Sequence, residues 1–136
     1  MITAVDTSVL ISIYKGEADG QSWLDLLQKR SRLGRLLACE VVVAEFSALA
    51  RSRKETVAFF EDLGIAFDPL VPEAALLAGE TFHLHRKAGG PREHLIPDFL
   101  IGAHAQIQAG GIAAADRGYL RRYFSKLRVL KPAGIT

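Results

Sequence analysis

Short apolar runs alternate with longer segments of helical periodicity along the chain, and this alternation constrains the fold more than any other feature. We expect strands at residues 2–5, 36–39, 65–67, 112–115 and, at a sheet edge, 128–130. We expect helices at residues 8–14, 19–31, 40–51, 56–63, 72–87, 97–108 and 119–124. Strands separated by helices pair in parallel, and the helices cover both faces of the sheet. The sequence therefore predicts a three-layer α/β/α sandwich with a mainly parallel central sheet.

Length and composition indicate a single domain spanning residues 1–136. With 136 residues and 49% hydrophobic content, the chain can build a core without disulfides or structural metals. The single cysteine, Cys39, lies in an apolar run and is expected to be buried. No apolar stretch reaches the roughly 18 residues that cross a bilayer, and the N-terminus does not resemble a signal peptide. We therefore expect a soluble, cytoplasmic protein.

Asp6 stands where the first predicted strand ends. Ligands of open α/β sheets bind just beyond the carboxyl ends of the strands, so Asp6 is a candidate functional acid. The alternative is that Asp6 only caps the following helix, because Asp accepts N–H bonds at helix starts. Thr7 or Ser8 could cap that helix instead, which would leave Asp6 available for chemistry.

Glu45 lies within an apolar helical segment. Its neighbours three and four positions away, Val41, Val42, Ala48 and Leu49, are all apolar, so we expect its carboxylate on the face that meets the core. A buried carboxylate must be paired, protonated or bound to a metal. A buried salt bridge is the alternative, but that face of the helix carries no basic residue. This pattern favours a functional role.

Asp98 occupies the first turn of the predicted helix 97–108, where the helix dipole alone could account for an acid. Its same-face neighbours Ile101, Gly102 and Ala105 are apolar or lack a side chain. The small ones leave room for a bound group. Asp98 is therefore a further candidate acid.

Asp116 follows the strand predicted at 112–115 as Asp6 follows the first strand. Ordinary turn chemistry is the alternative, because Asp is common in turns. Converging carboxylates without matching bases repel one another, and a divalent cation removes that repulsion. Oxygen ligands favour Mg²⁺, or Mn²⁺, over zinc. The four acids Asp6, Glu45, Asp98 and Asp116 together therefore predict a metal site that binds phosphate oxygens and activates water.

The basic residues are grouped rather than spread evenly. Six of them, and one acid, lie between Asp116 and the end of the chain, and a second group surrounds Arg53. The net charge of +2 does not itself indicate nucleic acid. A rim of bases around an acidic metal site would, however, hold a polyanion.

The segments Val5-Asp6-Thr7-Ser8, Ala44-Glu45, the run 96–105 around Asp98, and Ala115-Asp116-Arg117-Gly118-Tyr119 resemble a PIN domain of the VapC type, the ribonuclease toxins of toxin–antitoxin pairs. The resemblance covers essentially the whole chain in order and spacing. It implies an α/β/α fold, a magnesium-dependent endoribonuclease, and a homodimer inhibited by a cognate antitoxin. It also implies that the four acids form the catalytic quartet.

We assign roles to individual residues as hypotheses. Asp6 and Asp98 would hold the metal directly, and Glu45 and Asp116 would complete the site through water or orient the nucleophile. Many relatives have a threonine where this chain has Ala114, so the role of Asp116 is the least defined. The residues expected to contact the RNA substrate are Thr7, Ser8, Arg117 and Arg121.

Two alternatives belong to other functional classes. A catalytically inactive PIN-like module would only bind RNA or protein. A phosphoacceptor signalling domain has similar length and alternation, but it needs paired acids after the first strand and a late lysine, and neither is present. His83 and His85 are two positions apart and make a poor metal pair. His104 is interpreted as a structural histidine.

Overall fold

A five-stranded sheet forms the centre of the computed structural model, which describes residues 1–89, 95–115 and 118–134. The strands are β1 (Thr3–Val5), β2 (Leu36–Ala38), β3 (Ile65–Phe67), β4 (Gly111–Ala113) and β5 (Arg128–Leu130). Their order is β3-β2-β1-β4-β5, and every pair is parallel. β1 is central, as its fully buried residues require.

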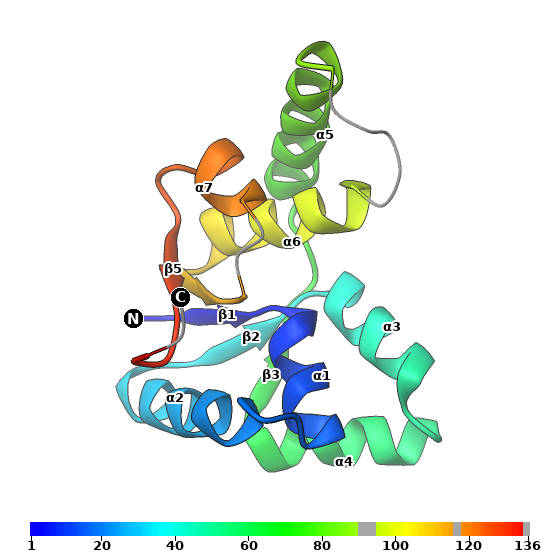
Figure 1. Cartoon of the computed structure of the whole chain (residues 1–136). Coiled ribbons are helices and arrows are strands. Elements are labelled where there is room, and N and C mark those ends of the chain that lie inside the picture. The colour runs from blue at the N-terminus through cyan, green and yellow to red at the C-terminus, as the bar shows by residue number, and fades with distance from the viewer. Residues whose placement is uncertain (90–94, 116–117, 135–136) are drawn as a thin grey trace.

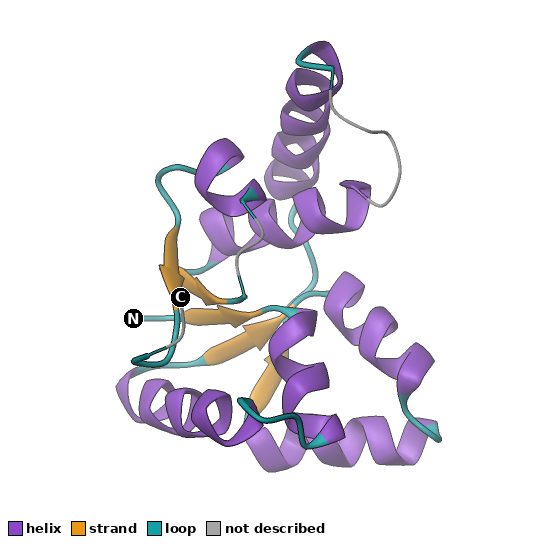
Figure 2. Cartoon of the chain, viewed as in Figure 1, coloured by secondary structure: helices purple, strands orange, loops and turns teal. Residues whose placement is uncertain are grey.

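Helices lie on both sides of this sheet (Figures 1 and 2). They are α1 (Thr7–Lys15), α2 (Gly20–Leu33), α3 (Glu40–Leu49), α4 (Arg53–Leu63), α5 (Pro72–Lys87), α6 (Leu95–Gln108) and α7 (Tyr119–Tyr123). In Figure 1, α1, α2 and α4 lie on one side, α6 and α7 lie on the other, and α5 packs against α6 and extends away from the sheet. The predicted α/β/α sandwich is confirmed. No helix among the described residues is long and apolar enough to span a membrane.

The core beneath α1 and α3 is built on aromatic rings. Phe46 of α3 is completely buried, with its ring stacked on Phe59 at 4.7 Å and edge-on to Tyr14 at 5.1 Å. Such ring pairs contribute beyond the apolar area that they bury. Cys39 lies at the start of α3 with 1% of its surface exposed, and burial raises the pKa of its thiol. The predicted burial of Cys39 is thus confirmed.

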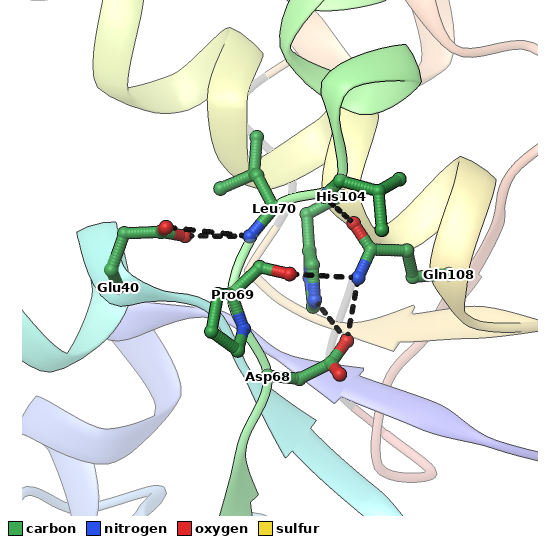
Figure 3. Close-up of polar contacts among 7 residues, drawn as sticks. Glu40, Asp68, Pro69, Leu70, His104 and Gln108 are labelled. Carbon is green, nitrogen blue, oxygen red and sulfur yellow. Dashed lines mark hydrogen bonds and ion pairs between the residues drawn. The ribbon is translucent and has the colours of Figure 1, made fainter.

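A polar network ties the segment after β3 to α6 and α3 (Figure 3). The Nε2 atom of buried His104 lies 2.8 Å from Oδ2 of Asp68, and the Gln108 amide donates to the same oxygen. The backbone N–H of Leu70 donates to the carboxylate of Glu40. His104 is therefore a structural residue, as its sequence context predicted. The network fixes α6, the helix that carries Asp98 at its first turn.

We expect Asp19 to make stability dependent on acid pH. The Ser12 hydroxyl, 2.5 Å away, and the Trp23 indole donate to its carboxylate and hold its pKa below the ordinary value of 3.8. A lowered folded-state pKa contributes stability that is complete above the unfolded-state pKa and is lost as pH falls through the folded-state pKa. Asp19→Asn should flatten this acid-side loss in urea unfolding between about pH 5 and pH 2. Parallel curves for the two proteins would contradict the assignment.

Candidate active site

A pocket of about 210 Å³ opens where β1 and β4 end. It contains three of the four predicted carboxylates, brought together from β1, α3 and α6. The lining residues are Asp6, Thr7, Ser8, Ile11, Glu45, Asp98, Ala114, Ala115, Tyr119 and Leu120. Carboxyl ends of parallel strands are where open α/β sheets place ligands. The fold therefore gathers acids that are up to 92 residues apart in the sequence (98 − 6) into one concave surface.

Asp6 both caps α1 and lines the pocket. Its Oδ2 atom accepts a hydrogen bond from the backbone N–H of Ser8 at 3.2 Å and another from the Ser8 hydroxyl. Thr7 lies inside the helix, so the expectation that Thr7 or Ser8 caps it in place of Asp6 is wrong. The two interpretations of Asp6 are compatible, because a cap at the end of β1 also faces the pocket.

Thr7 connects two elements of the site. Its hydroxyl donates to Oε1 of Glu45 across 2.7 Å, which links the first turn of α1 to the middle of α3. The Thr7 side chain is only 8% exposed, so the donor has little freedom to turn elsewhere. This bond positions the Oε1 atom of the Glu45 carboxylate. The orientation of that carboxylate therefore depends on the Thr7 hydroxyl.

The prediction that Glu45 projects from the core-facing side of its helix is wrong. α3 directs Val42 and Phe46 into the core, whereas Glu45 is exposed at the pocket wall. The apolar neighbours misled the prediction because α3 also exposes apolar side chains, including Leu49 at 49%. The carboxylate of Glu45 is therefore solvated and carries no large desolvation penalty.

Asp98 lies in the first turn of α6, exposed to solvent, while the next residue, Phe99, is fully buried. An acid at this position is stabilised by the helix dipole. The expected room for a bound group beside Gly102 is not there, because a Cβ on Gly102 would lie 2.5 Å from the Phe124 ring. The small residue admits an aromatic side chain of the core instead of a ligand.

The fourth predicted acid, Asp116, and the neighbouring base Arg117 lie outside the described residues. The structure does place Ala114 and Ala115 on the pocket wall directly before them. Arg121, on α7, is exposed. The roles of Asp116, Arg117 and Arg121 stay predictions.

The donor chemistry of the pocket fits a hard divalent cation. Its carboxylate and hydroxyl oxygens are ligands of the kind that Mg²⁺ and Mn²⁺ prefer. Within residues 1–89, 95–115 and 118–134, no three His, Cys, Asp or Glu side chains form a cluster that could hold a metal ion. Mg²⁺ does not require three such side chains, because it keeps several waters and binds through one or two carboxylates.

Sequence reasoning missed the apolar side of the pocket. Ile11, Tyr119 and Leu120 line it opposite the acids. Tyr119 was predicted as a helix start and stands in one of the segments that resemble a PIN domain, but it was given no role in the site. Its position just after the Asp-Arg-Gly segment that follows β4 was the available signal. Its ring packs edge-on against Phe99 at 6.1 Å, so it forms a firm wall for whatever occupies the pocket.

Comparison with known families decides what kind of domain this is. The family model described as the PIN domain matches residues 3–125. The chain belongs to the PIN domain family. The strand order of this PIN domain also excludes the phosphoacceptor alternative, because signalling domains of that class have the order 2-1-3-4-5. No curated protein sequence matches it significantly.

Solved structures share the fold of this PIN domain at low sequence identity. VapBC2 from Rickettsia felis bound to a promoter DNA fragment matches with a TM-score of 0.74 at 15% identity, covering 96% of this chain and 98% of that chain. VapBC-1 from nontypeable Haemophilus influenzae matches with a TM-score of 0.72 at 17% identity, and it has the same coverage of both chains. FitAcB from Neisseria gonorrhoeae matches with a TM-score of 0.60 at 22% identity, covering 97% of this chain and 98% of that chain. The predicted resemblance to the PIN domain family is therefore confirmed, and these structures share the fold of the chain.

Proposed function

We propose that this PIN domain is a metal-dependent endoribonuclease that acts as the toxin of a toxin–antitoxin pair. The observation that carries the proposal is the convergence of Asp6, Glu45 and Asp98 on one pocket beyond the carboxyl ends of the strands. Acids gathered in this way suit a divalent cation that binds phosphate oxygens. The fold shared with VapBC and FitAcB structures supports the toxin role.

The proposed partners follow from the same likeness. We expect a cognate antitoxin that covers the pocket or its rim, and a homodimer in the cytoplasm. Two of the matching structures are named VapBC, and the one from Rickettsia felis is bound to a promoter DNA fragment, which supports an assembly of this kind for the chain. Co-expression with the neighbouring open reading frame followed by pull-down tests the antitoxin, and a free monomer without a partner would count against it.

In the proposed mechanism, Asp6 and Asp98 would hold Mg²⁺, or Mn²⁺, and the bound cation would supply the positive charge that polarises a phosphate and lowers the pKa of water. Glu45, which accepts a hydrogen bond from the Thr7 hydroxyl, would orient the attacking water and accept its proton. Asp116 would share this role. Arg117 and Arg121 would contact neighbouring phosphates, since guanidinium groups match phosphate geometry. Thr7 and Ser8 act chiefly through the carboxylates, because their hydroxyl protons already point to Glu45 and Asp6.

Cleavage of RNA by the purified chain, measured with and without EDTA, tests the nuclease. We expect cleavage with Mg²⁺ or Mn²⁺ and none after chelation. Binding of RNA without cleavage under any divalent metal would support the inactive PIN-like module instead. A map of cut sites on total RNA would then identify the target class.

Thr7→Val should reduce RNA cleavage about tenfold, because it removes the hydroxyl that directs Glu45 while keeping the side-chain shape. Thr7→Ser retains a hydroxyl and should keep most of the activity. The pH profile is the informative readout, since a misdirected base changes the pH dependence of kcat and a simple packing defect does not. Equal losses in the two variants would reject the positioning role.

A further inference from the structure

Basic residues are concentrated in two segments that contain no acid. Residues 26–39 and 117–136 hold ten of the 17 Lys and Arg residues and no Asp or Glu. Elsewhere bases and acids are mixed. Two like-charged segments far apart in the sequence would repel each other if the fold brought them together without a counterion.

The fold does bring these segments together. Lys29 of α2 and Lys131 after β5 line one groove. Beside it, the Met1 sulfur lies 3.7 Å from the Nη2 atom of Arg30 and packs toward the start of β5 at Arg128. We name this surface the basic edge, and it consists of Lys29, Arg30, Arg32, Arg35, Arg128 and Lys131.

The charges of the basic edge are not neutralised within the described chain. None of its six residues forms an ion pair with a described residue. The Nε atom of Arg30 is buried and has no hydrogen-bond acceptor among the described groups. Asp25 also lines the groove, where its carboxylate accepts from Gln21. The cationic groups of the basic edge are therefore available to an anionic ligand.

The basic edge is separate from the acidic pocket. Arg35 precedes β2 and Arg128 begins β5, whereas the pocket lies where β1 and β4 end. Strands of three residues are about 10 Å long, so Arg35 and Arg128 lie at the opposite edge of a thin sheet from the pocket. Lys131 follows the carboxyl end of β5 and joins this surface through the groove beside α2, which shares no lining residue with the pocket. Leu36 and Arg128 are in register three strands apart, which makes the basic edge about 14 Å wide.

We propose that the basic edge binds the sugar–phosphate backbone of a structured RNA that extends beyond the cleavage pocket. This inference rests on the proposed function, which makes RNA the substrate. A folded RNA can reach both edges of the sheet, whereas a short single strand in the pocket cannot. Four bases of the edge, Lys29, Arg32, Arg35 and Arg128, are exposed and form no ion pair with a described acid, which suits the phosphates of a nucleic-acid backbone.

Anisotropy of a fluorescein-labelled RNA stem-loop tests the proposal, with Asp98→Asn in every protein to prevent cleavage. The test variant is Lys29→Gln, Arg32→Gln, Lys131→Gln. The control variant removes the same charge elsewhere, as Lys15→Gln, Arg86→Gln, Lys87→Gln, at exposed positions outside both basic groups. We expect the test variant to bind about tenfold more weakly and to lower the slope of log K against log salt by about 2. The control should change affinity by less than about threefold.

Several outcomes would overturn the proposal. Equal losses in the two triple variants would show that net charge alone matters, and equal loss for a DNA duplex of the same sequence would reject RNA as the partner. Thermal melts confirm that each protein is folded. Cleavage is measured separately with Asp98 intact, so an inactive chain would reject the nuclease while the binding measurements still decide the role of the basic edge.

Discussion

The double variant Asp6→Asn, Asp98→Asn should lose RNA cleavage by about a thousandfold and lose measurable Mg²⁺ or Mn²⁺ binding. Both carboxylates line the pocket from different elements, and amide oxygens bind these cations far more weakly than carboxylates do. Loss of the charges that hold the cation removes several kcal/mol of transition-state stabilisation. Cleavage rates and calorimetric metal titration give the two readouts.

This double variant is designed to keep the fold. Asparagine is as good an N-cap as aspartate, so Asp6→Asn retains the bond from the Ser8 N–H to the cap. Asp98 is exposed, and Asp98→Asn keeps a polar side chain of nearly the same size at this solvated position. Asp62→Asn, on the exposed surface of α4, is the matched control and should change neither readout. Unchanged metal binding in the double variant would reject the assignment of Asp6 and Asp98.

Phe46→Ala should cost about 3–5 kcal/mol of unfolding free energy, the typical value for removing a fully buried phenylalanine. The ring stacks on Phe59 and packs edge-on against Tyr14 and Phe60, so its removal leaves a cavity that three rings line. Because α3 also carries Glu45, we expect activity to fall as the helix loosens. Urea unfolding measures the loss of stability.

Phe67→Ala is the matched control for this substitution. Phe67 is the last residue of β3 and is 59% exposed, so the same change of side chain removes little buried area. We expect a change of less than about 1 kcal/mol. A comparable loss at both positions would show that the aromatic cluster around Phe46 does not stabilise the fold as described.

The fold could be predicted because local signals agree with the global arrangement. Gly16 and Gly64 end their helices in the left-handed conformation, with φ of 65° and 68°, which glycine adopts without strain. Buried parallel strands need continuous apolar runs, and the sequence contains them. The predicted helix began at Thr56, three residues after the observed start of α4 at Arg53. The Ser52 side chain caps this helix by accepting a hydrogen bond from the backbone N–H of Glu55.

The site was only partly predictable, because its remaining features depend on tertiary packing. The position of Asp6 followed from the end of a strand, but the exposure of Glu45 depends on which side of α3 the core covers. The use of the space beside Gly102 depends on Phe124, which is 22 residues further along the chain (124 − 102). No local pattern reports such a contact. The bond from Thr7 to Glu45 joins residues 38 positions apart for the same reason.

Burial of Cys39 makes this chain convenient for spectroscopy. It is the single cysteine in the sequence, and the native fold shields its sulfur from reagents. A cysteine introduced on the outer face of α5, as in Leu76→Cys at 67% exposure, would accept a dye or spin label selectively. Distances between such labels could then be followed while the native thiol stays in place.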